Sequence, residues 1–331
     1  MSCTYRGSYF ETDNFYATTL HVLSGFQILL HTFGAYVILW KTPKVMEKVK
    51  YPMLLVHFTC VSWDVLINIL LVPVVVFSIC AGYPLGVLQT FGVPIWLQAY
   101  LGFTVLFLLG PAVVMFFENS YNYLVREDSE TTSRRVKRGI HYFLNYLVTI
   151  LAFAPPVYNG GEPRDSRGIA LKKLPCLPTV ILDNPIFYSL GNEWLVQVFV
   201  IVFIVFIWVQ GLFFFFKTSS FIFRTKAQSR RTSDLQKKFF LAICAQIALP
   251  FVVIMIPGGY VISTLFTQHY DILLSNLSIV WATNHGMFST LIMLMVHKPY
   301  RVETFRILRL DDSGRHKVLN ALMLNRSSMY T

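Results

Sequence analysis

Asp64 is the one acid of this chain that lies deep within a long apolar stretch. The sequence holds 17 Asp and Glu residues, and the others lie at the ends of apolar stretches or between them. A carboxylate at the centre of a bilayer costs roughly 2.5–3.5 kcal/mol or more, so such an acid turns toward other protein groups. We expect Asn284 and Ser289, in a different apolar stretch, to be its partners. Two interpretations stay open: a hydrated, cation-sensitive hub that couples two membrane spans, or a protonated acid with a structural role.

A second polar group, Glu118-Asn119-Ser120-Tyr121, stands where another apolar stretch ends. An acid there can hold a neighbouring helix by pairing with a cation, and Arg134 and Arg135 follow soon after. These residues are therefore candidates for a contact that couples helices at the membrane surface. The alternative is an ordinary acid at that surface.

The residue types needed for catalysis or metal binding are not arranged for either task. None of the eight histidines pairs with another at i,i+3 or i,i+4, and neither a GxSxG motif nor a P-loop occurs. The five cysteines contain no CxxC pair, which argues against a zinc site. We expect no enzyme activity, no cofactor and no metal.

The cysteines leave their pairing open. Cys176 lies in the longest loop between apolar stretches, on the side that the charge distribution below places outside the cell, where disulfides form. Cys80 lies near the outer end of an apolar stretch and is one candidate partner. Cys3 is an equal candidate, and a free thiol is a third interpretation.

The elements that must position these residues are membrane-spanning helices. Hydrophobic residues make up 55% of the 331 residues and charged residues only 14%, against about 25% in soluble domains. The apolar runs are continuous and about 20 residues long, as a bilayer-crossing helix requires. The sequence predicts an all-α polytopic membrane protein, a seven-transmembrane helix bundle, with spans at about 17–40, 52–79, 93–117, 140–158, 194–216, 239–263 and 273–297.

The positive charges indicate how these spans are oriented. Of the 28 Lys and Arg residues, 23 fall on one side of the predicted bundle and five on the other. The positive-inside rule then puts residues 1–16 outside the cell and the tail, 298–331, in the cytoplasm. The net charge is +11, but most of the Lys and Arg residues are spread over four segments beside a lipid bilayer, which argues against nucleic acid as a partner.

Two local patterns bear on movement and anchoring. The sixth span contains Pro250 and Pro257, with Gly258 directly after the second proline, so we expect a kink in this helix. The kink is either a pivot for movement or a static bend. After the seventh span, His297, Lys298, Pro299, Tyr300 and Arg301 mark the exit from hydrocarbon. The residues at about 300–310 then predict a short amphipathic helix on the cytoplasmic leaflet.

Eight short motifs, in order across the predicted spans, make this chain resemble the nematode serpentine receptors of class H. This family of chemoreceptors belongs to the seven-transmembrane G-protein-coupled receptors. The motifs are Lys41-Thr-Pro-Lys44, Leu54–Phe58 with Trp63-Asp64, Ala81–Gly86, Phe117-Glu-Asn119, Leu174-Pro-Cys-Leu-Pro178, Leu235–Phe240, His285-Gly286 with Ser289-Thr290, and His297–Arg301.

The resemblance implies a plasma-membrane receptor on sensory neurons. It would bind a small external chemical among spans three, five, six and seven and signal through a heterotrimeric G protein. It also implies that Glu118-Asn119 occupies the place of the acid-Arg coupling motif, so that Glu118 to Tyr121, with Arg134 and Arg135, are candidates for G-protein coupling. Family members commonly carry Arg after Glu-Asn, whereas this chain has Ser120.

That departure keeps a second function open, a non-signalling or degenerate membrane protein that binds a ligand. A transporter or channel subunit is a weaker alternative, because one deep acid and unequal spans show neither a polar pathway nor an internal repeat.

Overall fold

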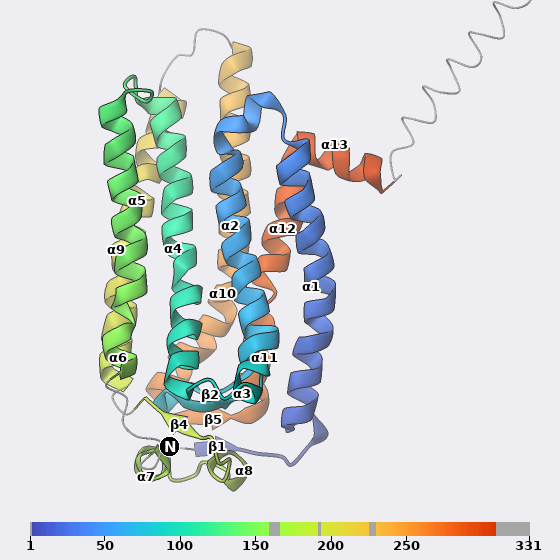
Figure 1. Ribbon diagram of the computed structural model, residues 1–331, viewed down its shortest axis with the longest axis vertical. Coiled ribbons are helices and arrows are strands. Elements are labelled where there is room, and N and C mark those ends of the chain that lie inside the picture. The colour runs from blue at the N-terminus through green and yellow to red at the C-terminus, as the bar shows by residue number, and fades with distance from the viewer. Residues whose placement is uncertain (1, 159–165, 191–192, 225–229, 309–331) are drawn as a thin grey trace, which may run out of the picture.

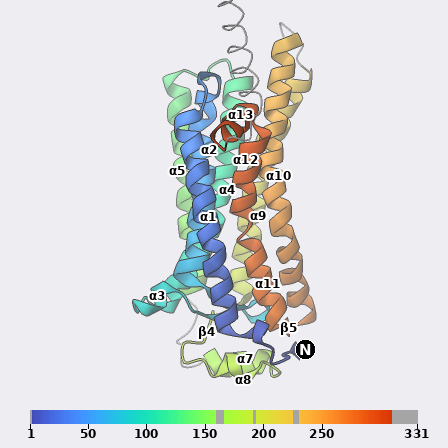
Figure 2. The ribbon, with the colours of Figure 1, turned by 90° about the vertical axis from the view of Figure 1, so that its right-hand side faces the viewer.

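The fold is a bundle of long helices closed at one end by short strands. A computed structural model describes residues 2–158, 166–190, 193–224 and 230–308. The long helices run side by side, the N-terminus lies at one end of the bundle, and α13 lies across the other (Figures 1 and 2). The main helices are α1 (Asp13–Lys41), α2 (Glu47–Val65), α4 (Ile95–Val125), α5 (Thr132–Ala152), α9 (Glu193–Arg224), α10 (Arg230–Thr267), α11 (Ile272–Ala282), α12 (His285–Val296) and α13 (Lys298–Ile307).

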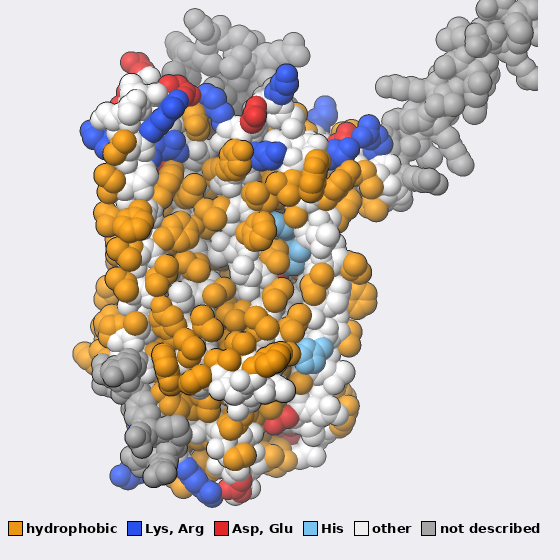
Figure 3. Space-filling model, in the orientation of Figure 1, with side chains coloured by type: hydrophobic (Ala, Val, Ile, Leu, Met, Phe, Trp, Pro, Cys, Tyr) orange, Lys and Arg blue, Asp and Glu red, His pale blue; other side chains and the backbone are white. Residues whose placement is uncertain are grey.

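Within the described residues, six helical segments are long and apolar enough to cross a membrane. They correspond to all the predicted spans except the fourth. There α5 packs beside α4 but begins with four cations, and the short α6 (Ala154–Tyr158) with its two prolines follows directly. Exposed hydrophobic side chains cover the middle of the bundle (Figure 3), as expected for a surface in contact with lipid.

The second span ends earlier than its apolar sequence predicts. A π-helix, η3 (Leu66–Leu71), continues α2, and Val72 then adopts a left-handed backbone conformation with φ of 43°. The chain turns there into β2 (Pro73–Val76) instead of remaining helical to residue 79. Apolar β-branched residues such as Val74 to Val76 suit a buried strand as well as a helix, so hydropathy alone could not separate the two.

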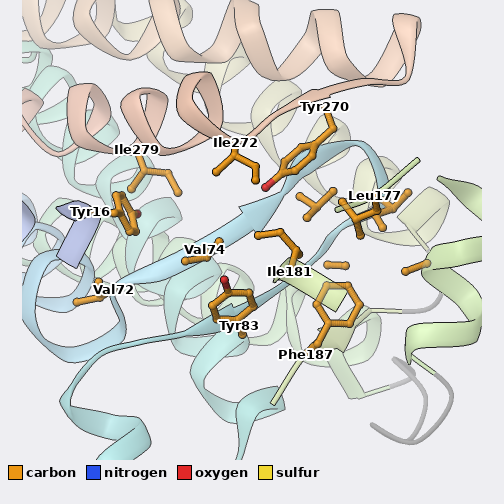
Figure 4. Packing of buried hydrophobic residues seen from close by; sticks show 14 of the residues in the cluster. Tyr16, Val72, Val74, Tyr83, Leu177, Ile181, Phe187, Tyr270, Ile272 and Ile279 are labelled. Atoms are coloured by element: carbon orange, nitrogen blue, oxygen red, sulfur yellow. The ribbon is translucent and has the colours of Figure 1, made fainter. Parts of the chain in front are cut away.

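The strands and short helices form a cap over the N-terminal end of the bundle. An antiparallel sheet has the order β2–β3–β4, and β1 pairs in parallel with β5. The remaining members of the cap are β1 (Ser2–Thr4), β3 (Ala81–Pro84), α3 (Val87–Thr90), α7 (Ser166–Lys173), α8 (Thr179–Leu182), β4 (Tyr188–Ser189) and β5 (His269–Asp271). Buried hydrophobic residues from the strands, α8 and the ends of α1 and α11 pack together beneath it (Figure 4).

The opposite end carries most of the Lys and Arg side chains, and we call it the basic end (Figure 3). The segments predicted as loops there are largely helical: α4 continues to Val125, α5 begins at Thr132, α9 continues to Arg224, and α10 begins at Arg230. Long helices therefore extend the bundle beyond its apolar middle at this end.

Candidate functional site

A cavity of about 340 Å³ lies between the helices and the cap. It is bounded by the end of the second span, by α4, α9 and α10, and by the sheet. Predicted spans three, five and six thus contribute to it, but the seventh span contributes no lining residue and the second takes its place. Its lining side chains include Trp63, Ile67, Phe77, Gln98, Phe103 and Val261.

Local backbone structure positions the sheet against this cavity. The left-handed turn at Val72 directs β2 across the helix ends, and β3 pairs with it from Pro73–Pro84 to Val76–Ala81. A Cβ on Gly82 would overlap the carbonyl oxygen of Val74, so glycine permits this close approach of the two strands. The sheet therefore forms one wall of the cavity, to which Val74, Gly82, Tyr83 and Tyr188 contribute.

Asp64 lies at the centre of a buried polar network and is 2% exposed. Its Oδ2 lies 2.9 Å from Nε2 of His31, and its Oδ1 lies 3.9 Å from Nδ1 of His285. Nδ1 of His31 lies 3.0 Å from the Thr290 hydroxyl. A Cβ on Gly286 would overlap the Asp64 carboxylate, so glycine makes room for the acid against α12. The network joins α1, α2 and α12.

The expected partners of Asp64 were wrong, although Asp64 does lie against the seventh span, beside His285. Asn284, between α11 and α12, donates its side-chain amide to the Val280 carbonyl of α11, and the Ser289 hydroxyl lies against Cys60. Histidine spacing along the sequence could not show that His31 and His285 converge on one acid, because they lie on different spans. Trp63 packs edge-on against His285, so the network adjoins a residue of the cavity wall.

At the basic end, Glu118 forms a second cluster and is 2% exposed. Its carboxylate accepts from Nη2 of Arg134 at 2.7 Å and from Nε of Arg138 at 2.9 Å, and it also accepts from the Tyr142 hydroxyl. Pairing of Glu118 with Arg134 was predicted. Arg138 and Tyr142 were not, although their i,i+4 spacing along α5 places both on the face of Arg134.

The other predicted members of this group lie nearby, with different partners. Arg135 pairs with exposed Glu130 rather than with Glu118. Asn119 accepts from Arg138 and donates to the Lys48 carbonyl, which ties α4 to α2. Ser120 is 4% exposed, and its hydroxyl donates to the Phe116 carbonyl of its own helix. Tyr121 packs against aromatic rings of α9.

The prolines predicted to kink the sixth span both lie within α10, and Gly258 follows in the same helix. Pro257 has no amide hydrogen to give to the carbonyl of Val253, four residues earlier. The indole Nε1–H of Trp281, from α11, donates to that carbonyl at 2.9 Å. The proline thus creates an acceptor through which the sixth and seventh spans contact each other.

The predicted membrane exit is a sharp change of direction between α12 and α13. His297 ends α12 and its Nε2 lies 3.0 Å from Oε1 of Gln246, while Pro299 occupies the first turn of α13. Arg301 donates to the Met295 carbonyl. Tyr300 was expected at headgroup depth but is fully buried, with its hydroxyl 2.8 Å from that of Thr42. The predicted amphipathic helix is α13, and the rest of the tail, 309–331, lies outside the described residues.

Cys176 forms a disulfide with Cys3, which corrects the candidate pair Cys80–Cys176. Pairing of β1 with β5 holds Cys3 within the cap, where it meets Cys176. Cys80 instead follows η4 (Phe77–Ile79) and lines the cavity. The sequence could not distinguish Cys3 from Cys80 as the partner of Cys176, because the strand that positions Cys3, β1, is only three residues long and has no marked pattern.

A charged cluster secures the same N-terminal segment. Arg6 pairs with Glu11 at 3.1 Å and with Asp271 at 2.6 Å. Burial by itself would raise the pKa of Glu11, but the backbone amides of Ser8 and Arg6 and the Arg6 guanidinium hold it below its usual value. Burial would likewise raise the pKa of Asp271, but hydrogen bonds from Arg6 and from the Leu274 amide outweigh it and hold that pKa below its usual value. Both acids are thus bound in their ionised form.

Comparisons with known proteins agree with this architecture. Residues 11–310 match the family described as "Serpentine type 7TM GPCR chemoreceptor Srh". The chain is 22% identical over 279 residues to serpentine receptor class H-72 of Caenorhabditis elegans, covering 82% of this chain and 79% of that protein. Its fold is similar to that of squid rhodopsin, with a TM-score of 0.57 at 12% identity over 90% of this chain and 87% of rhodopsin.

Proposed function

We propose a function from the premise that this chain belongs to the Srh family of serpentine-type seven-transmembrane chemoreceptors. In this proposal it binds a small external chemical in the cavity and signals through a heterotrimeric G protein at the basic end. The family is a receptor family and not an enzyme family, and the chain is a multi-pass membrane protein. Family membership does not by itself specify the ligand, the G-protein partner or the orientation in the plasma membrane, and these three points are proposed here.

The main support for the proposal is that one helix, α4, contributes residues both to the cavity and to the Glu118 cluster at the basic end. Gln98, Gly102 and Phe103 of α4 line the cavity, and Glu118 of the same helix forms the cluster at the basic end. A helix of 31 residues is about 46 Å long at 1.5 Å per residue. A ligand that favours one position of α4 or α10 can therefore change the surface at the far end, provided that its affinity for the two conformations differs.

The positive charge of the basic end supports its assignment to the cytoplasm. Lys and Arg side chains gather there, as the positive-inside rule predicts for cytoplasmic segments. The disulfide lies at the opposite end, as suits an oxidising compartment. This orientation gives an external ligand access to the cavity end.

The test compares the wild-type chain with Gly102→Phe, a substitution that fills the cavity from α4 while leaving the basic end unchanged. Recruitment of a G-protein surrogate to the plasma membrane is measured across a chemical panel at matched surface expression. We expect Gly102→Phe to abolish the response. Gly25→Phe, at a glycine of α1 with open space around it, is the matched control and should retain the response. Equal responses from all three chains would contradict the proposed binding site.

A non-signalling ligand-binding protein is the second candidate function, and Ser120 is the observation that favours it. Where the family resemblance calls for arginine, this chain has a buried hydroxyl bonded to its own helix. Ser120→Arg is therefore included in the same experiment. Recruitment by Ser120→Arg but not by the wild type would favour the non-signalling function, whereas recruitment by the wild type would show that arginine is dispensable.

A further inference from the structure

The cavity between the helices and the cap presents almost no polar atom to a ligand. Nearly all of the accessible surface of its wall is apolar, and no Asp, Glu, Lys, Arg or His is among the described residues that line it. A charged ligand would lose its hydration there without gaining a counter-ion. A neutral polar group would lose its hydrogen bonds to water without a replacement. The wall therefore favours hydrocarbon.

Polar side chains in this wall have their polar atoms covered or already hydrogen-bonded. Oε1 of Gln98 and Nε1 of Trp63 are buried with almost no accessible surface, so neither is offered to a ligand. Nε2 of Gln98 donates to the Val93 carbonyl at 2.8 Å. The Tyr83 hydroxyl donates to Oδ1 of Asp13 at 3.0 Å. Neither Val93 nor Asp13 lines the cavity, so what these polar residues present to it is carbon.

The volume of the cavity limits the size of that hydrocarbon. An engineered apolar cavity of about 150 Å³ in another protein stays dry and binds benzene, a ring of six carbons. At the same filling, the volume of about 340 Å³ found here holds roughly 14 carbons. The small residues Ala99 and Gly102 of α4 and the branched Val200 of α9 and Val261 of α10 are among those that surround this volume.

We infer that the cavity binds an uncharged hydrocarbon group of roughly ten to fourteen carbons, held by burial of apolar surface and by shape rather than by hydrogen bonds. This inference deepens the proposed function and rests on it for taking this cavity as the ligand site. It concerns binding alone, which is measured without a G protein. Specificity then depends on the space that small residues such as Ala99 leave open.

The first arm of the test varies the probe and follows Cys80, which lines the cavity and is not part of the Cys3–Cys176 disulfide. The protein is the full-length chain purified in detergent, with Cys244→Ala to remove the other partly exposed thiol. Bound probe should slow alkylation of Cys80 by N-ethylmaleimide, and Cys80→Ser gives the blank.

The probes are naphthalene, biphenyl and bibenzyl, each compared at equal free concentration with its hydroxylated and its carboxylated analogue. A hydroxyl buried without a partner should weaken binding roughly five- to 150-fold. The carboxylates should give no protection, because the described wall holds no cation.

The second arm reduces the volume. Ala99→Leu fills part of the cavity from α4, and Val200→Phe fills it from α9 and serves if Ala99→Leu does not fold. Either should exclude bibenzyl and still bind naphthalene, since the larger side chain removes space but adds no polar group. A protein that is merely loosened would lose both probes. Gly211→Leu, at a glycine of α9 with open space around it, is the matched control and should bind all three hydrocarbons.

The third arm identifies the source of the hydrocarbon, because the cavity is partly open and lies in a membrane-spanning bundle. The source is either a free external molecule or the acyl chain of a membrane lipid. Lipid retained by the purified protein is quantified by mass spectrometry. Lipid that stays with the wild type and with Gly211→Leu but not with Ala99→Leu identifies the acyl chain. Protection of Cys80 by added probe in protein that retains no lipid identifies a free molecule.

Three results would overturn the inference. The first is protection of Cys80 by hydroxylated or carboxylated probes as strong as that by their parent hydrocarbons. The second is protection by bibenzyl that survives both Ala99→Leu and Val200→Phe. The third is the absence of both retained lipid and protection by any hydrocarbon.

Failure of the proposed signalling is separate and distinguishable. If hydrocarbons protect Cys80 while no G-protein surrogate is recruited, the ligand class stands and the signalling proposal fails. If a charged chemical drives recruitment and no hydrocarbon protects Cys80, signalling stands and the ligand class fails.

Discussion

At the scale of single residues, Glu118 holds the basic end together because two guanidinium groups and one hydroxyl meet on its carboxylate. The acid is buried while Arg134 and Arg138 remain partly exposed, with side chains 19% and 13% accessible. Removing the charge leaves two cations without their partner at a site that water reaches only in part.

We therefore predict that Glu118→Gln destabilises the chain measurably. A fully buried pair costs roughly 3–5 kcal/mol when one partner is removed, and partial exposure of the arginines reduces the expected loss to about 2–3 kcal/mol. The measurement is the midpoint of denaturant unfolding in detergent. Glu130→Gln is the control, since the pairs of Glu130 with Lys48 and Arg135 are exposed and should matter little.

Also at this scale, the sequence identified the important acids more successfully than it identified the residues that contact them. The cost of a charge in hydrocarbon identified Asp64, and the end of a span identified Glu118. The partners His31, His285, Arg138 and Tyr142 depend on how helices are rotated about their axes, which hydropathy does not determine. Gln98 was missed for a similar reason, because a glutamine near the start of a span has no distinctive pattern.

At the scale of elements, the contact between α10 and α11 uses a backbone hydrogen bond that is missing from α10. Pro257 removes one hydrogen bond from α10, and Trp281 of α11 uses the carbonyl that is left. A backbone carbonyl facing lipid without a donor is costly, so the two helices depend on each other at this point.

Trp281→Phe should therefore weaken the contact, and its effect should depend on residue 257. With Pro257 present, the substitution leaves the Val253 carbonyl unpaired and should cost about 1–3 kcal/mol. In a Pro257→Ala background, the alanine amide returns to that carbonyl, so Trp281→Phe should cost much less. A double-mutant cycle on thermal stability measures the difference. Additive effects would show that the indole bond does not replace the hydrogen bond that Pro257 removes, and Trp194→Phe, at an exposed tryptophan of α9, is the control.

The same contact bears on the predicted pivot. A sixth span that moves on activation would have to break or shift the bond from Trp281. Pro250→Ala with Pro257→Ala should blunt the agonist response at normal surface expression, if the prolines provide the hinge. An unchanged response, measured by G-protein recruitment, would reject a pivot at these positions.

At the scale of the whole molecule, the Arg6 cluster joins residues far apart in the sequence and should make the cap sensitive to acid. The pKa values of Glu11 and Asp271 are lower in the folded chain than their ordinary values. Their contribution is therefore complete above the ordinary carboxylate range and is lost as pH falls through the lowered values. Hydrogen-exchange protection in β1 and β5, taken relative to the intrinsic exchange rate at each pH, should thus fall at acidic pH. Arg6→Gln should remove most of this dependence, and equal protection at neutral and acidic pH would contradict it.

The disulfide should stabilise the cap through its long span of sequence. Cys3 and Cys176 are separated by 173 residues, and a bond that closes a loop of such length is worth about 5 kcal/mol in the chain-entropy estimate. Cys3→Ser and Cys176→Ser should lower the melting temperature by similar amounts, and the double variant by no more than either. Cys80→Ser should leave the melting temperature nearly unchanged. A large effect of Cys80→Ser alone would indicate a different pairing.

Across the whole molecule, composition and charge were enough to predict a seven-transmembrane bundle. The cap was not predicted, because its strands are two to four residues long and are defined by pairing rather than by pattern. Its members come from four separate parts of the chain, and only tertiary contacts assemble them.

The parallel pairing of β1 with β5 also has a consequence for how the protein is made. Ser2 lies opposite His269, so the first strand has no partner until nearly the whole chain has left the ribosome. At roughly 5–20 residues per second, the N-terminal segment remains without its β5 partner for tens of seconds during synthesis. In the proposed orientation Cys3 is during that interval a thiol in a compartment that oxidises thiols, and its partner Cys176 is synthesised well before β5. The covalent bond can therefore form first and hold the N-terminus in place, so that β5, the last strand of the cap to be synthesised, pairs with a first strand that is already anchored.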